Sequence, residues 1–215
     1  MAASDLAKKL AGRFIVLDGP DGSGKSTQIA LLRDHLAAAG ADVLCVHDPG
    51  ATAVGEKIRS ILLDPKQTHL SPIAETLLFM ASRAQLVAEK VRPALAAGKV
   101  VLCDRFISAT IAYQGASGVP ADLIVRVGEL AVGNLWPDLT IILDLPAEVG
   151  MARAARRGAG DRVESRAMAY HDEVRENFRA LRDGYPAPVV HVDATLDRPN
   201  VFANILAELE KAFGR

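Results

Sequence analysis

One stretch near the start of the chain has the residue types and spacing of a phosphate-binding loop. Residues 19–26 read Gly-Pro-Asp-Gly-Ser-Gly-Lys-Ser, which fits a glycine, four residues and then Gly-Lys-Ser. Glycines allow a tight turn whose backbone N–H groups face phosphate oxygens, and a following helix adds the positive end of its dipole. We expect Lys25 to reach the terminal phosphates of a nucleotide and the Ser26 hydroxyl to bind Mg²⁺.

The surroundings of this loop favour a nucleotide over the alternative, a glycine-rich turn with no ligand. The β-branched run 14–17 precedes the loop and a helical run, 27–39, follows it, as the pattern requires. The residues that we expect to contact the nucleotide are Gly19, Pro20, Asp21, Gly22, Ser23, Gly24, Lys25, Ser26 and Thr27.

A second candidate site residue ends another apolar run. Residues 100–103 are followed by Asp104 and Arg105. A carboxylate at the end of a buried strand emerges beside the phosphate loop, where it can hold Mg²⁺ through water. Because an unpartnered buried guanidinium is costly, Arg105 either forms a structural ion pair or faces an anion, and we favour the anion. Polar side chains then recur at helical spacing, on a binding face or on a solvated one: Ser108, Thr110, Tyr113 and Gln114.

Two further segments are consistent with an acceptor site. His47, Asp48, Pro49 and Gly50 follow the second predicted strand, where ligands bind in open parallel sheets, although an ordinary turn explains them equally well. Phe79 and Arg83 lie four apart on one side of a predicted helix, so Phe79 can stack on a base while Arg83 reads its edge. Taken alone, this pair is better explained as a core phenylalanine beside a surface arginine.

An arginine-rich segment with internal glycines follows the fourth predicted strand. Glycines at 158 and 160 suggest a flap that closes positive charge over phosphates, whereas a basic solvated helix would not need them. No aromatic residues alternate with the arginines, which disfavours a single-strand nucleic-acid groove. The cluster comprises Arg153, Arg156, Arg157, Arg162 and Arg166.

These residues must be positioned by alternating strands and helices, which predict an α/β fold with a five-stranded parallel sheet and helices on both faces. The expected strands are 13–17, 42–46, 99–103, 139–143 and 189–192. A long helical stretch, 72–97, carries Pro93 near its end, where we expect a kink. We expect a short frayed extension over residues 1–12, then one domain over 13–215 with a lid at about 153–166.

Composition limits the class of protein. With 25 basic and 26 acidic residues the net charge is −1, which argues against a nucleic-acid-binding surface. No apolar run approaches the roughly 20 residues of a membrane span, and the first 13 residues lack a signal-peptide pattern, so we expect a soluble cytoplasmic protein. Cys45 and Cys103 lie in apolar runs and are expected to be buried core thiols.

Several blocks in one order make the chain resemble the thymidylate kinase family. They cover nearly the whole chain: residues 14–28, the Asp-Pro-Gly loop at 48–50, 78–86, 104–115, 137–140 and 161–164. The resemblance implies the P-loop kinase fold, transfer of a phosphoryl group from ATP to dTMP with Mg²⁺, and a homodimer. Another nucleoside monophosphate kinase of the UMP/CMP type is the nearest alternative, and a P-loop switch ATPase or GTPase is a more distant one.

The resemblance also implies roles for individual residues. Lys25 serves ATP, Ser26 and Asp104 serve Mg²⁺, and Asp21 lies near the acceptor sugar. Catalytic roles are expected for Lys25, Asp21 and Arg105, and our own hypothesis from the glycine-flanked cluster adds Arg153, Arg157 and Arg162. Acceptor binding, with Phe79 stacked on thymine and Arg105 on the acceptor phosphate, is implied for Asp21, Asp48, Pro49, Phe79, Arg83, Arg105, Thr110, Tyr113 and Gln114.

The chain departs from the family pattern at three places. His47 stands where the family usually has arginine, which removes a permanent charge near the acceptor phosphate. Ala109 and Thr110 stand where two serines are common. Some members carry a basic residue at the position of Gly22, so we expect the lid arginines to supply that charge here.

Overall fold

The regular alternation of β-branched runs with helical segments produces a layered α/β fold in the computed structural model, which describes residues 2–67, 69–156, 161–181 and 184–214. Within these residues the sheet has five strands, all parallel, in the order β2-β3-β1-β4-β5. The strands are β1 (Phe14–Asp18), β2 (Val43–His47), β3 (Val100–Asp104), β4 (Leu139–Asp144) and β5 (Val189–Asp193). All five lie within one residue of the predicted ranges, so the predicted α/β class with a five-stranded parallel sheet is confirmed.

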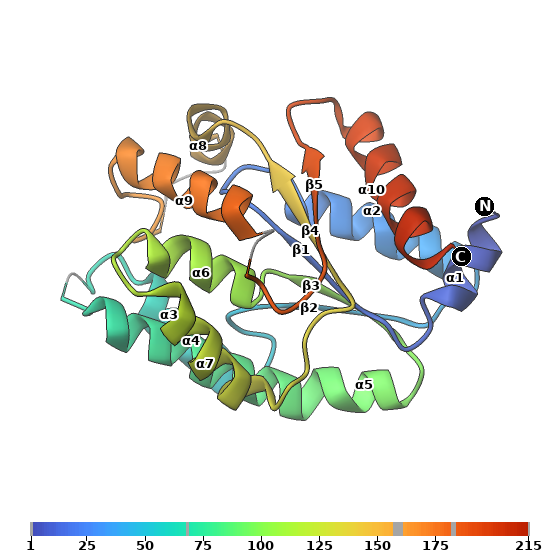
Figure 1. The fold of residues 1–215 in the computed structure, drawn as a ribbon, viewed down its shortest axis with the longest axis horizontal. Helices are drawn as coiled ribbons and strands as arrows, with labels where there is room; N and C mark the ends of the chain where they lie inside the picture. The colour runs from blue at the N-terminus through green and yellow to red at the C-terminus, as the bar shows by residue number, and fades with distance from the viewer. Residues whose placement is uncertain (1, 68, 157–160, 182–183, 215) are drawn as a thin grey trace.

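Helices cover both faces of this sheet (Figure 1). Their bounds are α1 (Ala3–Lys9), α2 (Lys25–Ala38), α3 (Ala53–Leu63), α4 (Pro72–Leu86), α5 (Arg92–Ala96), α6 (Ile107–Gly115), α7 (Ala121–Val132), α8 (Ala147–Ala155), α9 (Met168–Ala180) and α10 (Arg198–Phe213), with a π-helical segment η1 (Val87–Val91). One apolar core joins one sheet face to α1, α2 and α10, and a larger core joins the other face to α4, α6, α7 and α9. β1 and β3 are therefore buried on both faces, and their carboxyl ends are fixed.

The strand register brings the chemistry to one edge of the sheet. Leu17 of β1 pairs with Asp104 of β3, and His47 of β2 pairs with the same Asp104. The phosphate loop therefore leaves β1 beside the two polar strand ends, as expected at the carboxyl edge of an open parallel sheet.

Two expectations were wrong in detail, and a third is refined. Residues near the N-terminus are not frayed, because α1 packs on α2 and α10 and buries Leu6 and Leu10. Cys103 is buried as predicted, but Cys45 is exposed, because β2 is an edge strand of the sheet. The long helical stretch changes to η1 before Pro93, which has no N–H to donate to the preceding turn.

No helix among residues that the structure describes combines the length and the apolar character needed to cross a membrane.

Candidate active site

The phosphate loop forms a cradle at the start of α2. Gly24, the residue before the helix, offers no side chain to cap the first turn, so backbone N–H groups there remain available to an anion. α2 begins at Lys25, two residues before the predicted helical run. At Gly22, with φ +73°, a Cβ would lie 2.0 Å from the Gly150 carbonyl oxygen. Only glycine fits this approach of the loop to α8, and the basic side chain found at this position in some family members cannot be accommodated.

Lys25 is folded onto the loop that it is expected to serve. Its Nζ donates to the carbonyl oxygens of Gly19 (3.0 Å) and Pro20 (2.9 Å) and to Ser23 Oγ (3.3 Å). Burial and the nearby Arg105 guanidinium lower the pKa of Lys25 to about 8. The charged form of this amine is therefore destabilised at the phosphate loop, and an anionic phosphate bound there would stabilise it.

Ser26 and Asp104, the two predicted magnesium residues, come together. Ser26 Oγ donates to Asp104 Oδ2 over 2.8 Å, joining the first turn of α2 to the end of β3. Hydroxyl and carboxylate oxygens are the donors that Mg²⁺ prefers, and this ion commonly takes only one or two protein ligands beside substrate phosphates and water. Within the part of the chain that the structure describes, no group of three or more His, Cys, Asp or Glu is placed to hold a metal. The pair fits a phosphate-bound Mg²⁺ better than a protein-enclosed one.

Arg105 is the centre of a second polar group. Its φ of +70° turns the guanidinium back toward the loop, where it donates to the Gly19 carbonyl oxygen (2.9 Å) and forms ion pairs with Asp18 (3.3 Å) and Asp21. The Tyr113 hydroxyl donates to Asp21 Oδ2 over 2.8 Å and accepts from Arg105 over 3.2 Å. Sequence reasoning favoured an anion over structural ion pairs for Arg105; the structure has ion pairs with Asp18 and Asp21, while the side chain also lines the cavity.

The two carboxylates beside Arg105 differ in environment. Burial raises the pKa of Asp18, although the charge of Arg105 opposes this effect. For Asp21, burial also acts to raise the pKa, but the charges of Arg105 and Lys25 outweigh it and the pKa is lowered. Asp21 is thus the more firmly ionised of the two, and it occupies the cavity side of the network.

The Asp-Pro-Gly loop and α4 are joined by a buried ion pair. Arg83 is 1% exposed, and its Nε donates to Asp48 Oδ2 over 2.6 Å. Its Nη2 donates to the Phe106 carbonyl oxygen (3.0 Å) and to Thr110 Oγ1 (3.1 Å). The preferred reading of Phe79 and Arg83 alone, with a surface arginine, was wrong, because Asp48 supplies a buried partner that sequence spacing did not reveal.

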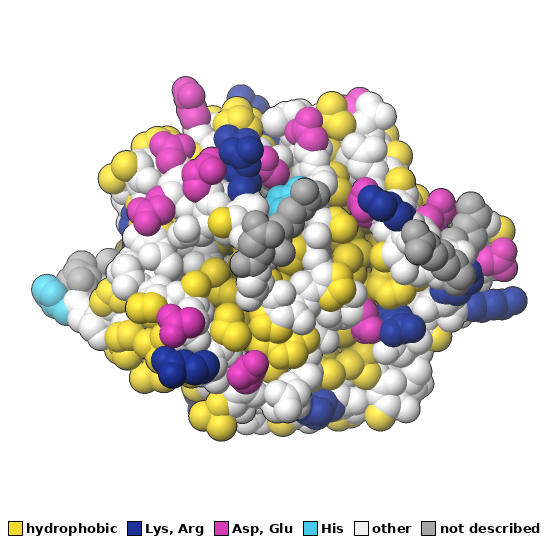
Figure 2. Space-filling view, in the orientation of Figure 1, with side chains coloured by type: hydrophobic (Ala, Val, Ile, Leu, Met, Phe, Trp, Pro, Cys, Tyr) yellow, Lys and Arg dark blue, Asp and Glu magenta, His cyan; other side chains and the backbone are white. Residues whose placement is uncertain are grey.

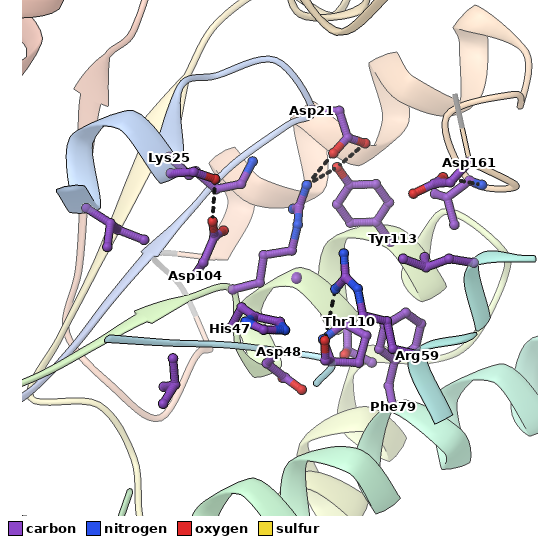
Figure 3. Close-up of a pocket in the computed structure, with 18 of the residues that line it drawn as sticks. Asp21, Lys25, His47, Asp48, Arg59, Phe79, Asp104, Thr110, Tyr113 and Asp161 are labelled. Carbon is purple, nitrogen blue, oxygen red and sulfur yellow. Dashed lines mark hydrogen bonds and ion pairs between the residues drawn. The ribbon is translucent and has the colours of Figure 1, made fainter. Parts of the chain in front are cut away.

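These groups surround one cavity of about 640 Å³ (Figure 3). Lys25 and Asp104 lie at one side, and Phe79, Thr110 and Tyr113 lie at the other. Most of the predicted site residues line it: Asp21, Gly22, Gly24, Lys25, Ser26, Thr27, Asp48, Pro49, Phe79, Arg83, Asp104, Arg105, Thr110, Tyr113 and Gln114. The sequence thus identified a set of residues that the fold brings together.

The predicted lid arginines are dispersed. Arg153 Nη1 donates to the Ala194 carbonyl oxygen over 3.0 Å, and Arg156 is exposed at the end of α8. Arg162 Nε donates to the Leu62 carbonyl oxygen over 2.9 Å. Arg157 lies outside the described residues. The structure therefore holds Arg153 and Arg162 on backbone carbonyls at different places and does not gather them over the phosphate loop.

Three residues near the site were not proposed from the sequence: Arg59, Asp18 and Glu75. Arg59 donates to the Pro49 carbonyl oxygen over 2.9 Å and lines the cavity. Asp18 ends a buried strand directly before the loop, as Asp104 does, and that position was a usable signal. Glu75 forms ion pairs with Arg162 and Arg166 of the predicted cluster, which a lone helical glutamate does not predict.

Comparisons with known proteins agree with this geometry. The family model described as Thymidylate kinase matches residues 17–205. Proteins named thymidylate kinase are similar to this chain: 47% identical in Exiguobacterium sp., over 86% of this chain and 88% of that protein; and 42% identical in Deinococcus radiodurans, over 93% and 97%. A third, from Pseudomonas fluorescens, is 45% identical over 86% and 89%.

Proposed function

The chain belongs to the thymidylate kinase family, and from this premise we propose how its residues divide the work of the reaction. It is a phosphotransferase that uses ATP to convert dTMP to dTDP. The observation that best supports our assignment is the single cavity that contains Lys25, the Ser26–Asp104 pair and the Arg105 network. One end suits the donor phosphates and the other suits a nucleotide base.

The donor end consists of the phosphate loop and Lys25. Backbone N–H groups of the loop and of the first turn of α2 bind the ATP phosphates, and Lys25 leaves its carbonyl partners to follow the charge of the terminal phosphate. Ser26 and Asp104 hold Mg²⁺, which neutralises charge on the phosphate oxygens when it is bound. Phosphoryl transfer depends mainly on alignment and charge stabilisation, which these groups supply.

The acceptor end places the dTMP phosphate at Arg105 and the base between Phe79 and Thr110. Asp21 and Tyr113 hold the guanidinium toward the cavity, and both lie beside the acceptor sugar. Arg83 donates to the polar edge of thymine through Nη1, which in this structure donates to the Met80 thioether over 3.0 Å. The acceptor phosphate is already largely ionised at neutral pH, so no general base is required.

The lid supplies additional charge in our proposal. Arg153, Arg157 and Arg162 contribute to stabilising the transferring phosphoryl group, since position 22 admits only glycine. For Arg153 this requires release from the Ala194 carbonyl oxygen, and for Arg162 release from the Leu62 carbonyl oxygen and from Glu75, which keeps Arg166 as its partner. Residues 153–166 are the lid of a single kinase domain that begins at residue 13.

We also propose a homodimer in a reducing cytoplasm, without a nucleic-acid partner. Exposed apolar side chains on α4 and α7 support the dimer: Ile73, Leu77 and Leu130 are 46%, 51% and 85% exposed. Hydrophobic side chains gather over this region in Figure 2. The two unpaired cysteines and the net charge of −1 support the remaining expectations.

An acceptor panel tests the residue assignment together with the substrate. ATP turnover is measured by coupled release of ADP with dTMP, UMP, CMP and GMP, in wild type and in Lys25→Ala. We expect dTMP to be strongly preferred, and kcat to fall by orders of magnitude in Lys25→Ala, since the ammonium acts mainly on charge that develops in the transition state. Lys90→Ala, at an exposed position on η1, is the matched control. Near-normal kcat in Lys25→Ala overturns the donor-site assignment.

A further inference from the structure

Glu75 is a buried carboxylate that lies behind the base end of the cavity. It sits in the first turn of α4 and is 1% exposed. Gln114 Nε2 donates to its Oε1 over 2.8 Å. Its other oxygen, Oε2, lies 2.8 Å from Arg162 Nη2 and 3.2 Å from Arg166 Nη2. Arg166 Nη2 also donates to Oε1 over a longer 3.4 Å, so Gln114 has the shortest contact to Oε1, while Arg162 and the shorter Arg166 contact are on Oε2.

This arrangement fixes which atom of the Gln114 amide faces the cavity. A carboxylate paired with two guanidinium groups only accepts hydrogen bonds, so the amide must present Nε2 to Glu75 and turn Oε1 away. Gln114 is 1% exposed and lines the cavity, so an Oε1 turned away from Glu75 is available to a ligand there. The cavity therefore receives a fixed hydrogen-bond acceptor.

We propose that Glu75 is a positioning residue that sets base selectivity by holding the Gln114 carbonyl oxygen toward the acceptor base. A fixed acceptor at this point matches the imide N3–H of thymine or uracil and opposes the unprotonated N3 of cytosine, which is itself an acceptor. The inference rests on the proposed function, in which the end of the cavity that Gln114 lines holds the acceptor base. Glu75 would thus favour pyrimidine bases that carry an imide N–H, although Glu75 itself does not line the cavity.

Because of these guanidinium groups, a single substitution at Glu75 should invert the base selectivity. In Glu75→Gln, Arg162 and Arg166 require an acceptor and therefore hold the new carbonyl oxygen at the Oε2 position. The new NH₂ group then occupies the Oε1 position and faces Gln114. Two NH₂ groups cannot bond to each other, so the Gln114 amide must turn over and direct its own NH₂ into the cavity. The cavity acceptor becomes a donor, which suits cytosine.

The test compares kcat/KM for dTMP, dUMP and dCMP. In Glu75→Gln we expect the dTMP/dCMP ratio to fall by about tenfold or more, mainly through a higher KM for dTMP, because a matched hydrogen bond is replaced by two opposed donors. The dTMP/dUMP ratio should not change, since both bases have the same imide edge. Glu89→Gln is the matched control, because Glu89 accepts from the Gln85 amide (3.0 Å) outside the site.

A charge-preserving exchange keeps the proposal testable if Glu75→Gln does not fold. In Glu75→Gln/Gln114→Glu, the NH₂ group of residue 75 donates to the carboxylate at 114, whose second oxygen faces the cavity as an acceptor. We expect this double variant to prefer dTMP over dCMP as wild type does. Equal losses for all three acceptors in Glu75→Gln, or a double variant that prefers dCMP, would overturn the proposal.

Gln114→Ala separates this inference from the proposed function. If Gln114 faces the base, its removal lowers the dTMP/dCMP ratio, and adding Glu75→Gln to it produces no further change in that ratio. If Gln114→Ala leaves the ratio as in wild type, the placement of Gln114 at the base is wrong. If Gln114→Ala lowers the ratio but Glu75→Gln does not, the site stands and the role of Glu75 is wrong.

Discussion

At the scale of single residues, Lys25 illustrates how burial prepares a cation for a ligand. Its three hydrogen bonds are all to neutral loop oxygens, and desolvation works against its charge. The charged form is therefore less favoured than in water until phosphate arrives. Phosphate binding and protonation of Lys25 must then support each other.

We predict that ATP affinity depends on pH through Lys25. Its pKa in the free protein is about 8, and the phosphates of bound ATP raise it. Affinity should be level below pH 8 and then fall by up to about tenfold per pH unit as the pH rises above 8, because binding must take up a proton. Calorimetric titration between pH 7 and 9.5 measures this dependence. Lys25→Arg, whose charge persists, should give a flat curve, and a flat wild-type curve would contradict the prediction.

His47 shows how a neighbouring residue changes an expectation. Its Nε2 lies 2.8 Å from Glu56 Oε1, which also accepts from the Ala51 N–H over 2.7 Å. The imidazole thus fastens the Asp-Pro-Gly loop to α3 while it lines the cavity. Sequence reasoning considered only the loss of a permanent charge near the acceptor phosphate and did not identify Glu56 as the partner of His47.

His47→Arg is predicted to lower the KM for dTMP several-fold with little change in kcat. The longer guanidinium can keep Glu56 with one edge and present the other to the acceptor phosphate, as a charge-assisted fork. Steady-state kinetics with dTMP varied at saturating ATP measures the effect, with His47→Ala as the reference that lacks both interactions. An unchanged or higher KM would mean that position 47 serves the loop alone.

At the scale of elements, the phosphate loop and α8 are in backbone contact. A Cβ at Gly22 would meet Gly150, and a Cβ at Gly150 would lie 2.3 Å from the Asp21 carbonyl oxygen. The pair of glycines thus allows two backbones to approach where any side chain would force them apart. This contact fixes the donor loop against the helix that leads into the lid.

Gly22→Ala is predicted to lower stability and activity together. The left-handed φ costs roughly 1–2 kcal/mol for a residue with a Cβ, and the clash with Gly150 adds to that cost and displaces the loop. Gly118→Ala is the matched control, because its φ is +86° and its Cβ would have no atom within 4 Å. Thermal melts and kcat of both variants test the argument: equal losses would show that the loop–helix contact is unimportant.

The lid arginines are predicted to act as a group. Arg153→Ala and Arg162→Ala should each reduce kcat modestly, while the pair, or the pair of Arg153→Ala with Arg157→Ala, should reduce it by more than the product, up to about 10³-fold. Neighbouring arginines can replace one another in part, which explains the non-additivity. Arg179→Ala, at an exposed ion pair with Glu176, is the control. Unchanged kcat in every variant would leave Arg105 as the main cationic side chain at the acceptor phosphate.

At the scale of the whole molecule, the exposed apolar face of α4 and α7 is predicted to be a dimer interface. In analytical ultracentrifugation, wild type should have a mass of about twice 22.8 kDa. Leu130→Glu should shift the equilibrium toward the monomer, because a charge would be buried at the interface without a partner. Leu196→Glu introduces the same charge at another exposed position, in the loop before α10, and should leave the dimer intact. A wild-type monomer at micromolar concentration would contradict the proposal.

Much of this molecule is determined by the sequence alone. Apolar runs at regular intervals specified the parallel strands, most clearly the central β1, β3 and β4, because a strand buried on both faces is largely apolar. The glycine pattern of residues 19–26 specified a phosphate cradle, because few residue types allow that turn. Asp104 was predicted as a site residue from its position at the end of an apolar run, and Asp18 could have been predicted in the same way.

The tertiary structure decided the partners. Asp48 and Arg83 are 35 residues apart in the chain, and Glu75 and Arg166 are 91 apart, so no local sequence pattern predicts either ion pair. It also decided that Cys45 lies at a sheet edge, that α1 is docked, and that Arg153 and Arg162 rest on distant carbonyls. Hydrogen bonds between distant segments depend on how whole elements pack, and helical or strand periodicity specifies only which face of its own element a residue occupies.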